Sequence, residues 1–232
     1  KTRCLILNSP SNPTGSLYEI DELKMIARLA IKHKFFVISD EIYEKLVYDG
    51  KKCASIASLG KGIYDLTVTV NGVSKSYAMT GWRIGWSVSS LEIAKAMDCL
   101  QSQETSNPCS ISQHAAVAAL EGDQACVGQM LQEFARRRDF VVQRLREIPG
   151  VSVIEPEGAF YAFFSVRDHF GRQIGGRHVT DSSNFCGTAL EVAHVALVPG
   201  SAFGAEGYVR MSFAADMKQL ETGLEQLAKL LG

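Results

Sequence analysis

The first hundred residues alternate between two hydrophobic patterns, and this alternation limits the fold more than any other feature of the chain. Continuous apolar runs occupy residues 4–8, 35–39, 66–71 and 84–89. Between the first two runs, residues 19–34 carry apolar side chains three and four positions apart, which is the spacing of an amphipathic helix. Continuous runs joined by helices are typical of a parallel sheet that is covered on both faces. The sequence therefore predicts an α/β fold for this half, with a parallel or mixed sheet and helices on both faces.

The second half of the chain has a different pattern. Helices are predicted over residues 91–103, 111–122, about 125–148, 182–191 and 216–231. Strands are predicted over residues 151–154, 159–166, 193–199 and 208–214, with a polar loop before residue 180. We therefore expect a large domain over residues 1–122 and a smaller α+β domain over residues 123–232.

Composition excludes several classes of function. The chain has 24 Lys and Arg against 25 Asp and Glu, and this balance gives no support for a nucleic-acid or membrane-surface partner. No apolar run has the length of a membrane-spanning helix, and the apolar part of the N-terminal stretch is too short for a signal peptide, so we expect a cytoplasmic location. The six cysteines and five histidines follow no ligand spacing, and we expect no metal site.

Polar side chains follow each of the first three predicted strands. Asn12 comes after the first, Asp40 and Tyr43 after the second, and Lys75 after the third. Each has a purely structural alternative: a turn, a helix cap, packing or an exposed loop. Ligands of open parallel sheets bind beyond the carboxyl ends of the strands, where all four side chains are predicted to lie. Their convergence favours a binding site.

Lys75 limits the chemistry of that site. A lysine amine is a nucleophile only when neutral, and burial or a nearby cation such as Arg83 favours the neutral form. Such an amine suits a Schiff base with a carbonyl compound. If the carbonyl belongs to pyridoxal phosphate (PLP), the ring nitrogen needs a carboxylate, the ring oxygen needs donors, and the phosphate needs an arginine. Asp40, Tyr43 with Asn12, and Arg83 can fill those roles.

The segment GVSKSYAMTGWRIG at residues 72–85 resembles, position by position, the PLP-attachment signature of class I and II aminotransferases. Five further blocks match the same family in the same order: SPSNPTG (9–15), SDEIY (39–43), GAFY (158–161), VPGSAFG (198–204) and YVRMSFA (208–214). The resemblance covers the whole chain and is nearest to bacterial and plastid-type aspartate or aspartate/prephenate aminotransferases. It implies the aspartate-aminotransferase-like fold of PLP-dependent transferases, in the C-terminal portion of the family's chain.

The resemblance assigns the cofactor-binding residues. Lys75 would form the Schiff base with PLP and later carry the proton between substrate and cofactor. Asp40 would pair with the ring nitrogen, while Tyr43 and Asn12 would bond the ring oxygen. Arg83 would hold the phosphate.

The resemblance assigns fewer residues to the substrate. Arg210 would clamp the substrate α-carboxylate, with Asn12 assisting, and Ile42 occupies the position of an apolar residue under the cofactor ring. Gly72 stands where many relatives have a serine that helps to hold the phosphate. No arginine lies between Arg83 and Arg136, where one branch of the family places an arginine for a distal carboxylate.

The implied reaction is PLP-dependent transamination of an α-amino acid to a 2-oxo acid, of the aspartate/2-oxoglutarate type, in a parent protein that is a homodimer. Two alternatives stay open. One is another reaction on the same cofactor, such as a C–S lyase. The other is a non-catalytic, aminotransferase-like fragment or effector-binding domain. A serine hydrolase is unsupported, because Ser76 stands where the nucleophile elbow requires glycine.

Overall fold

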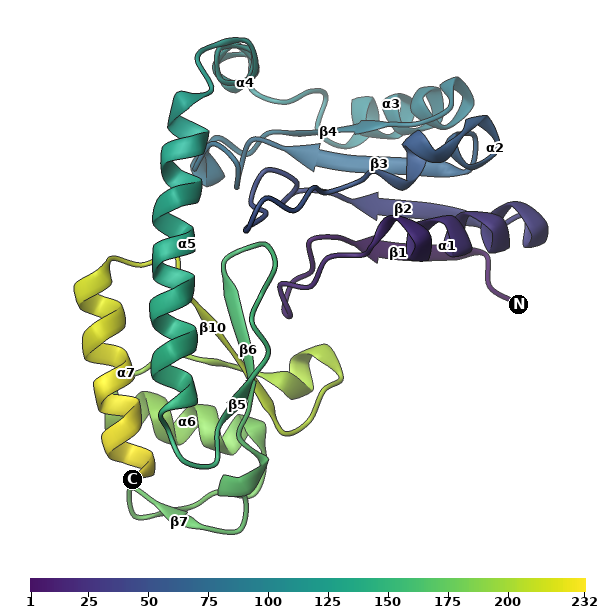
Figure 1. Cartoon of the computed structure of the whole chain (residues 1–232). Coiled ribbons are helices and arrows are strands. Elements are labelled where there is room, and N and C mark those ends of the chain that lie inside the picture. The colour runs from purple at the N-terminus through teal and green to yellow at the C-terminus, as the bar shows by residue number, and fades with distance from the viewer. The chain divides into compact units, whose positions relative to one another are not determined.

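The computed structural model describes residues 1–232, and the chain forms two compact units. Unit 1 contains residues 1–11 and 16–131, and unit 2 contains residues 12–15 and 132–232. Each unit has its own sheet (Figure 1). Helix α5 (Ala125–Arg146) contributes residues to both units, and the predicted boundary between residues 122 and 123 stays a prediction.

Unit 1 is built on a four-stranded sheet with the order β1-β2-β3-β4. These strands are β1 (Cys4–Asn8), β2 (Phe36–Asp40), β3 (Thr67–Gly72) and β4 (Gly85–Val88). The first three strands are parallel, and β4 pairs antiparallel with β3. The connection from β3 to β4 contains no α-helix, and a parallel pairing would need a longer crossover there. The sheet is therefore mixed, within the predicted class.

Two helices cover one face of this sheet. Helix α1 (Ile20–His33) begins where the Glu22 carboxylate accepts the N–H of Glu19 at 2.8 Å and ends at Lys34, which has a left-handed backbone. Helix α2 (Lys61–Tyr64) follows the short helix η1 (Ile56–Leu59). Side chains from these elements and from β1 and β2 form one buried apolar cluster: Leu7, Leu23, Ala27, Ala30, Val37, Ile56 and Ile63.

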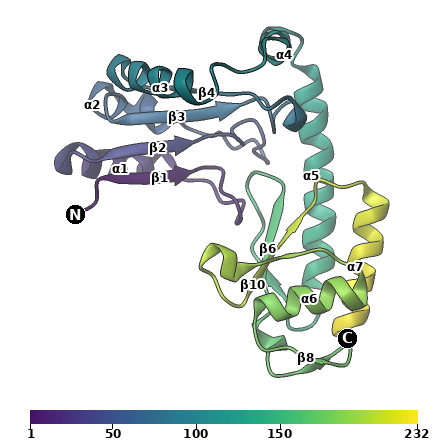
Figure 2. The same cartoon turned by 180° about the vertical axis from the view of Figure 1, so that it is seen from behind.

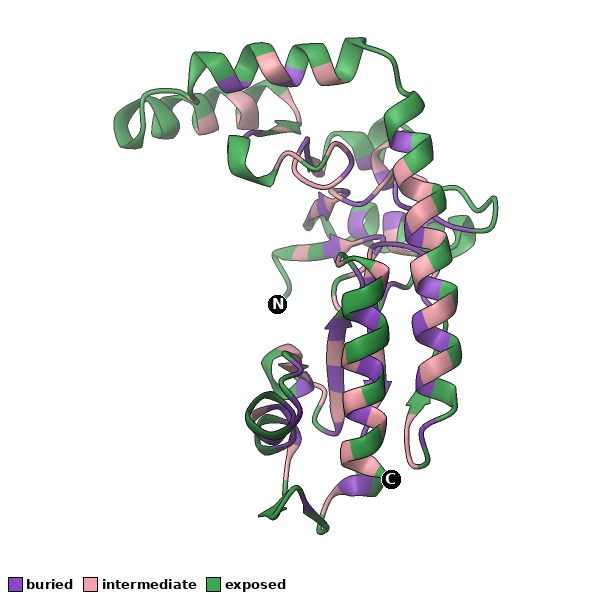
Figure 3. Cartoon of the chain, turned by 90° about the vertical axis from the view of Figure 1, so that its left-hand side faces the viewer, coloured by how far each residue is buried: buried purple, intermediate pink, exposed green.

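The opposite face of the sheet is covered only along β4. Helix α3 (Leu91–Glu104) lies there, since the Ser87 hydroxyl contacts the sulfur of Met97 at 3.9 Å, yet α3 has no buried residue. Ile6 on β1 points to this face and is 73% exposed. Helix α4 (Ser110–Glu121) buries little, as Figure 3 makes visible. Helices thus lie on both faces as predicted, but the face under α1 and α2 is buried more extensively than the face under α3.

Unit 2 contains a four-stranded antiparallel sheet with the order β5-β6-β10-β9. The strands are β5 (Ser152–Val153), β6 (Tyr161–Ser165), β10 (Tyr208–Ser212) and β9 (Val198–Pro199). Helices α6 (Ser182–Ala193) and α7 (Met217–Leu231) lie side by side (Figures 1 and 2). The largest fully buried side chains of this unit include Phe164, Phe185, Phe213, Leu145, Leu224 and Leu227.

Helix α5 agrees with the long helix predicted from the sequence. Its Phe134 ring stacks on Phe160 with centroids 5.5 Å apart and meets Phe213 edge-on at 6.4 Å, which joins the C-terminal part of the helix to the core of unit 2. None of the helices in residues 1–232, α5 included, combines the length and the apolar character that a membrane crossing requires.

The strand predicted over residues 193–199 is wrong for most of its length. Helix α6 continues to Ala193, His194 turns the chain with a left-handed backbone, and only Val198 and Pro199 pair with β10. Pro199 has no N–H to donate, so it suits an edge strand this short.

The polar loop predicted before residue 180 is also more ordered than expected. It contains a small hairpin of β7 (Gln173–Ile174) and β8 (Arg177–His178). Gly175 and Gly176 both have positive φ and form the two-residue turn, which favours glycine.

The first residue of α7 is preceded by a side-chain cap. The Asp216 carboxylate accepts the N–H of Gln219 at 2.9 Å. We expect Asp216→Ala to lower the free energy of unfolding by about 1 kcal/mol, because it leaves that N–H without a partner. Asp216→Asn keeps an acceptor and should stay within a few tenths of 1 kcal/mol. Urea unfolding followed by circular dichroism measures both; equal losses would contradict the assignment of the cap.

Candidate active site

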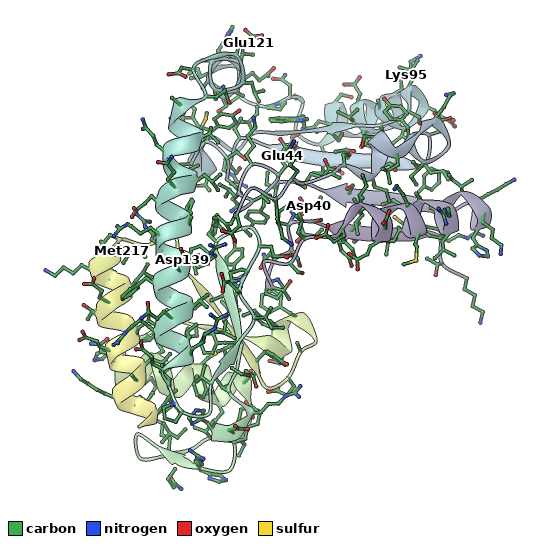
Figure 4. The ribbon with its side chains drawn as sticks, in the orientation of Figure 1. Asp40, Glu44, Lys95, Glu121, Asp139 and Met217 are labelled. Atoms are coloured by element: carbon green, nitrogen blue, oxygen red, sulfur yellow. The ribbon has the colours of Figure 1, made fainter.

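The parallel strands of unit 1 bring three chain segments to one edge of the sheet. Asn8 pairs with Asp40 at the end of β1 and β2, and Asp40 pairs with Val70 near the end of β3. The segment that carries Lys75 begins directly after β3. Figure 4 marks Asp40 at the end of β2 and Glu44 in the segment that follows. The predicted convergence beyond the carboxyl ends of the strands is therefore present for the residues of unit 1.

Asp40 has a well-defined backbone and a half-buried side chain. Its carbonyl oxygen accepts the Asn8 side-chain amide at 3.1 Å and the Ser9 N–H at 3.2 Å. Its carboxylate oxygen Oδ1 accepts the N–H of Ile42 at 3.2 Å. One carboxylate oxygen thus orients the following turn, and the group as a whole stays at the sheet edge.

Lys75 and Tyr43 are neighbours. The Lys75 Nζ atom lies 6.0 Å from the centroid of the Tyr43 ring, which is 4% exposed. Lys75 itself is half-buried, in a tight turn where the Ala78 N–H bonds the Lys75 carbonyl at 3.3 Å. The Lys75 amine is thus placed over the Tyr43 ring and is partly removed from water, where a bound carbonyl compound can reach it.

Arg83 lies at the end of the short helix η2 (Thr80–Trp82). Its backbone is left-handed, with φ of 53°, and its guanidinium nitrogen Nη1 donates to the Thr80 carbonyl at 2.8 Å. The side chain is exposed. One hydrogen bond uses only part of the donor capacity of a guanidinium group, so Arg83 can still bind an anion.

Gly72, where many relatives carry serine, has neighbours that explain the glycine. A Cβ atom there would lie 3.0 Å from the Ile84 carbonyl oxygen, 3.1 Å from the Gly85 Cα and 3.2 Å from the Ile42 Cδ1. Any side chain at this position would push these groups by a few tenths of an ångström. Glycine keeps the end of β3 close to Ile42.

In unit 2, Arg210 and Asn12 are in direct contact, although 198 positions separate them in the chain. Arg210 Nη1 donates to the Asn12 side-chain oxygen at 2.7 Å. The guanidinium lies over the rings of Tyr161 at 4.5 Å and Phe203 at 5.2 Å. Its Nε atom is buried and has no hydrogen-bond partner. A buried donor without a partner is rare, and here it can bind a carboxylate.

The sequence alone assigns no role to two groups of residues in the site. Tyr161 and Phe203 flank Arg210, and they lie in the segments GAFY and VPGSAFG, whose pattern does not say what they contact. Glu41, next to Asp40, is 5% exposed, and its Oε1 atom accepts the hydroxyls of Ser39 at 2.8 Å and Ser55 at 2.7 Å. Two consecutive acidic residues give no signal of which one is buried.

Burial changes the acidity of this neighbourhood. Desolvation raises the pKa of the Glu41 carboxyl above its ordinary value of 4.5, against the effect of the Ser55 and Ser39 hydrogen bonds. Burial and then the charges of Glu41 and Glu44 raise the pKa of the Cys53 thiol to about 12. The Cys53 thiol is therefore protonated at neutral pH and is not a nucleophile. It contacts the Ser9 carbonyl at 3.5 Å.

The chain belongs to the class I and II aminotransferase family, whose model matches residues 1–227. It is 46% identical over 231 residues to aspartate aminotransferase of Geobacillus stearothermophilus and 46% identical over 234 residues to the probable aspartate/prephenate aminotransferase of Rickettsia bellii. All of this chain is covered in both cases, against 58% and 59% of those relatives. The crystal structure of aspartate aminotransferase from Rhizobium meliloti superimposes with a TM-score of 0.95 and 43% identity, over 99% of this chain and 58% of that one.

These comparisons confirm the predicted family and fold class. They leave the individual site residues as predictions, together with the assignment of the chain to the C-terminal portion of the family. The chain spans less than two thirds of the length of the curated relatives that it matches.

The buried Glu41 carboxyl predicts a specific dependence of stability on pH. Because its pKa is raised in the folded protein, the cost of burying its charge grows as pH rises from about 4.5 through the folded pKa. Glu41→Gln removes the charge and keeps an acceptor for the two serine hydroxyls. We expect the variant to exceed the wild type in free energy of unfolding by on the order of 1 kcal/mol at pH 7, and the two to converge near pH 4.

Urea unfolding at several pH values measures this difference. Asp40→Asn, at the neighbouring and less buried carboxylate, is the matched control. A difference between Glu41→Gln and the wild type that grows toward acid pH would contradict the assignment.

Proposed function

We propose that this chain carries cofactor- and substrate-binding residues of a PLP-dependent aminotransferase that converts an α-amino acid to its 2-oxo acid. The observation that supports this most strongly is the half-buried Lys75 amine, which lies at the face of the Tyr43 ring and beyond the same sheet edge as Asp40. Membership of the aminotransferase family supports the same reaction class.

The residues of unit 1 fit the cofactor. PLP, when bound, supplies an aldehyde that condenses with a primary amine and a ring that withdraws electrons from the substrate carbon. The Lys75 amine would anchor the cofactor and would take and return the proton at the substrate Cα. The Asp40 carboxylate would hold a proton at the ring nitrogen. The Tyr43 hydroxyl would donate to the ring oxygen, and Arg83 would neutralise the phosphate.

The residues of unit 2 fit an α-carboxylate. The Nη1 atom of Arg210 is held by Asn12, and its Nε atom is a buried donor without a partner. The rings of Tyr161 and Phe203 lie against the guanidinium and favour its cationic form. A carboxylate therefore meets an arginine that is already oriented, with Asn12 beside it.

The amino acid substrate belongs to the aspartate/2-oxoglutarate type in this proposal. Support comes from the two relatives, one named an aspartate and the other a probable aspartate/prephenate aminotransferase, which are equally identical to this chain. A homodimer is part of the proposal as well. It is supported by large apolar side chains that are exposed on α3 and α4, among them Leu91, Leu100 and Ile111.

The anchor can be identified by trapping. The protein, expressed from its complete reading frame, is incubated with PLP and reduced with borohydride. Mass spectrometry of the peptides should then find the reduced adduct on Lys75 and none in Lys75→Ala. Lys45→Ala is the matched control, because the Lys45 Nζ also lies near an aromatic ring, 5.8 Å from Tyr77. An adduct that persists in Lys75→Ala, or that lies on Lys45, would refute the assignment.

The substrate clamp can be tested by kinetics. Arg210→Lys keeps the charge but removes the planar fork, so we expect KM for the amino acid to rise at least about tenfold, equivalent to roughly 1.4 kcal/mol or more. Arg167→Lys is the control, because Arg167 also lies over an aromatic ring, 5.0 Å from the Tyr208 centroid, but is exposed. Equal KM values for wild type and Arg210→Lys would rule out a role for Arg210 in binding the substrate.

A further inference from the structure

The proposed mechanism leaves one buried acidic residue of unit 1 without a role. Glu41 lies between Asp40 and Tyr43, and it is more deeply buried than Asp40. Burial of a carboxyl group is costly unless hydrogen bonds compensate for it. Two serine hydroxyls, at 2.7 Å and 2.8 Å, bond the same oxygen of Glu41.

The two serines come from different parts of unit 1. Ser39 belongs to β2, and Ser55 comes directly before helix η1. Ile56, the next residue, is fully buried in the apolar cluster under α1. Glu41 therefore bonds Ser39, which belongs to the sheet, and Ser55, whose neighbour Ile56 is part of the buried core.

The backbone around Glu41 is held in the same way. The Glu41 N–H donates to the Val70 carbonyl at 2.9 Å, which extends the pairing of β2 with β3 by one residue. The Glu44 N–H donates to the Glu41 carbonyl at 2.9 Å, and the Leu46 N–H donates to the Tyr43 carbonyl at 2.8 Å. Main chain and side chain of Glu41 thus fix the turn that presents Asp40 on one side and Tyr43 on the other.

A second contact joins the same loop to β1. The Cys53 thiol, two residues before Ser55, contacts the Ser9 carbonyl at 3.5 Å, and the Ser9 N–H bonds the Asp40 carbonyl at 3.2 Å. The segment from Cys53 to Ser55 therefore connects the ends of β1 and β2. Among the hydrogen bonds described for residues 53–55, the only one to an acidic side chain is the bond from Ser55 to Glu41.

We propose that Glu41 is a positioning residue: its buried carboxyl, bonded to Ser39 and Ser55, sets the orientation in which Asp40 and Tyr43 meet the cofactor. This inference rests on the proposed function. It requires an acceptor oxygen at this position rather than a negative charge, since both hydroxyls donate to one oxygen. Glu41→Gln should therefore keep the positioning role, and Glu41→Ala should lose it.

The test uses the protein expressed from its complete reading frame and loaded with PLP. Two readouts are measured for each folded variant: the dissociation constant for PLP, and the visible circular dichroism per bound cofactor, which reports how the cofactor is oriented. We expect Glu41→Ala to weaken PLP binding at least about tenfold and to change the dichroic signal by half or more. Glu41→Gln should stay within about threefold of the wild type, with the same signal.

Ser55→Ala is a milder variant that removes one hydrogen bond and leaves the carboxyl in place. It should weaken PLP binding about threefold, and it decides the question if Glu41→Ala does not fold. Unchanged affinity and dichroism in Ser55→Ala, or in a folded Glu41→Ala, would overturn the positioning role. So would a Glu41→Gln variant that loses as much as Glu41→Ala.

The outcomes separate this inference from the function on which it rests. A wild-type protein that binds no PLP at Lys75 overturns the proposed function, and the inference fails with it. A wild type that binds PLP, beside a Glu41→Ala variant that binds it equally well with the same dichroism, overturns the inference alone.

Discussion

The candidate site depends on the parallel pairing of β1, β2 and β3. Their hydrogen bonds set the register that places Asn8 beside Asp40 and Asp40 beside Val70. Because parallel strands all end at the same edge, polar residues from segments distant in sequence lie near one another there. A slip of one residue in β2 would turn Asp40 to the face that α1 covers and move Ser39 away from it.

The alternation of side chains along β2 also explains the different roles of two adjacent acids. Ser39 and Glu41 are two residues apart and point to the same side, where Ser55 completes a buried network. Asp40, between them, points to the other side and is less buried. One acid is thus available to a ligand, while its neighbour supports the turn that holds it. Burial raises the pKa of the Glu41 carboxyl, because removing its charge from water costs free energy.

Most strands and helices of unit 1 could be predicted from the sequence, because apolar runs and apolar spacing are local patterns. The apolar runs gave β1, β2 and β3 to within a residue or two, and the spacing of apolar side chains gave α1. The sequence predicts the convergence of Asn12, Asp40, Tyr43 and Lys75 because each follows a strand of a parallel sheet; Asp40, Tyr43 and Lys75 belong to unit 1, and Asn12 belongs to unit 2. The small hairpin at Gly175 and Gly176 had a local signal in its two glycines, but its strands are too short to form an apolar pattern.

Other features depend on contacts that no local pattern contains. The burial of Glu41 is decided by Ser55, which is 14 residues away, and the pairing of Arg210 with Asn12 joins residues 198 positions apart. The short helices η1 and α2 lack enough residues for a periodic signal, and they are held by the core under α1. The strand predicted over residues 193–199 shortens to Val198 and Pro199 because α6 continues to Ala193 and only these two residues pair with β10.

We propose that the sheet edge presents Asp40, and not Glu41, to the ring nitrogen of PLP. A crystal structure of the PLP-loaded protein, expressed from its complete reading frame, tests this proposal most directly. We predict an Asp40 carboxylate oxygen within about 3 Å of the ring nitrogen, with Glu41 still bonded to Ser39 and Ser55. A ring nitrogen that faces another group, or a Glu41 side chain turned out of its serine pair toward the cofactor, would contradict this account.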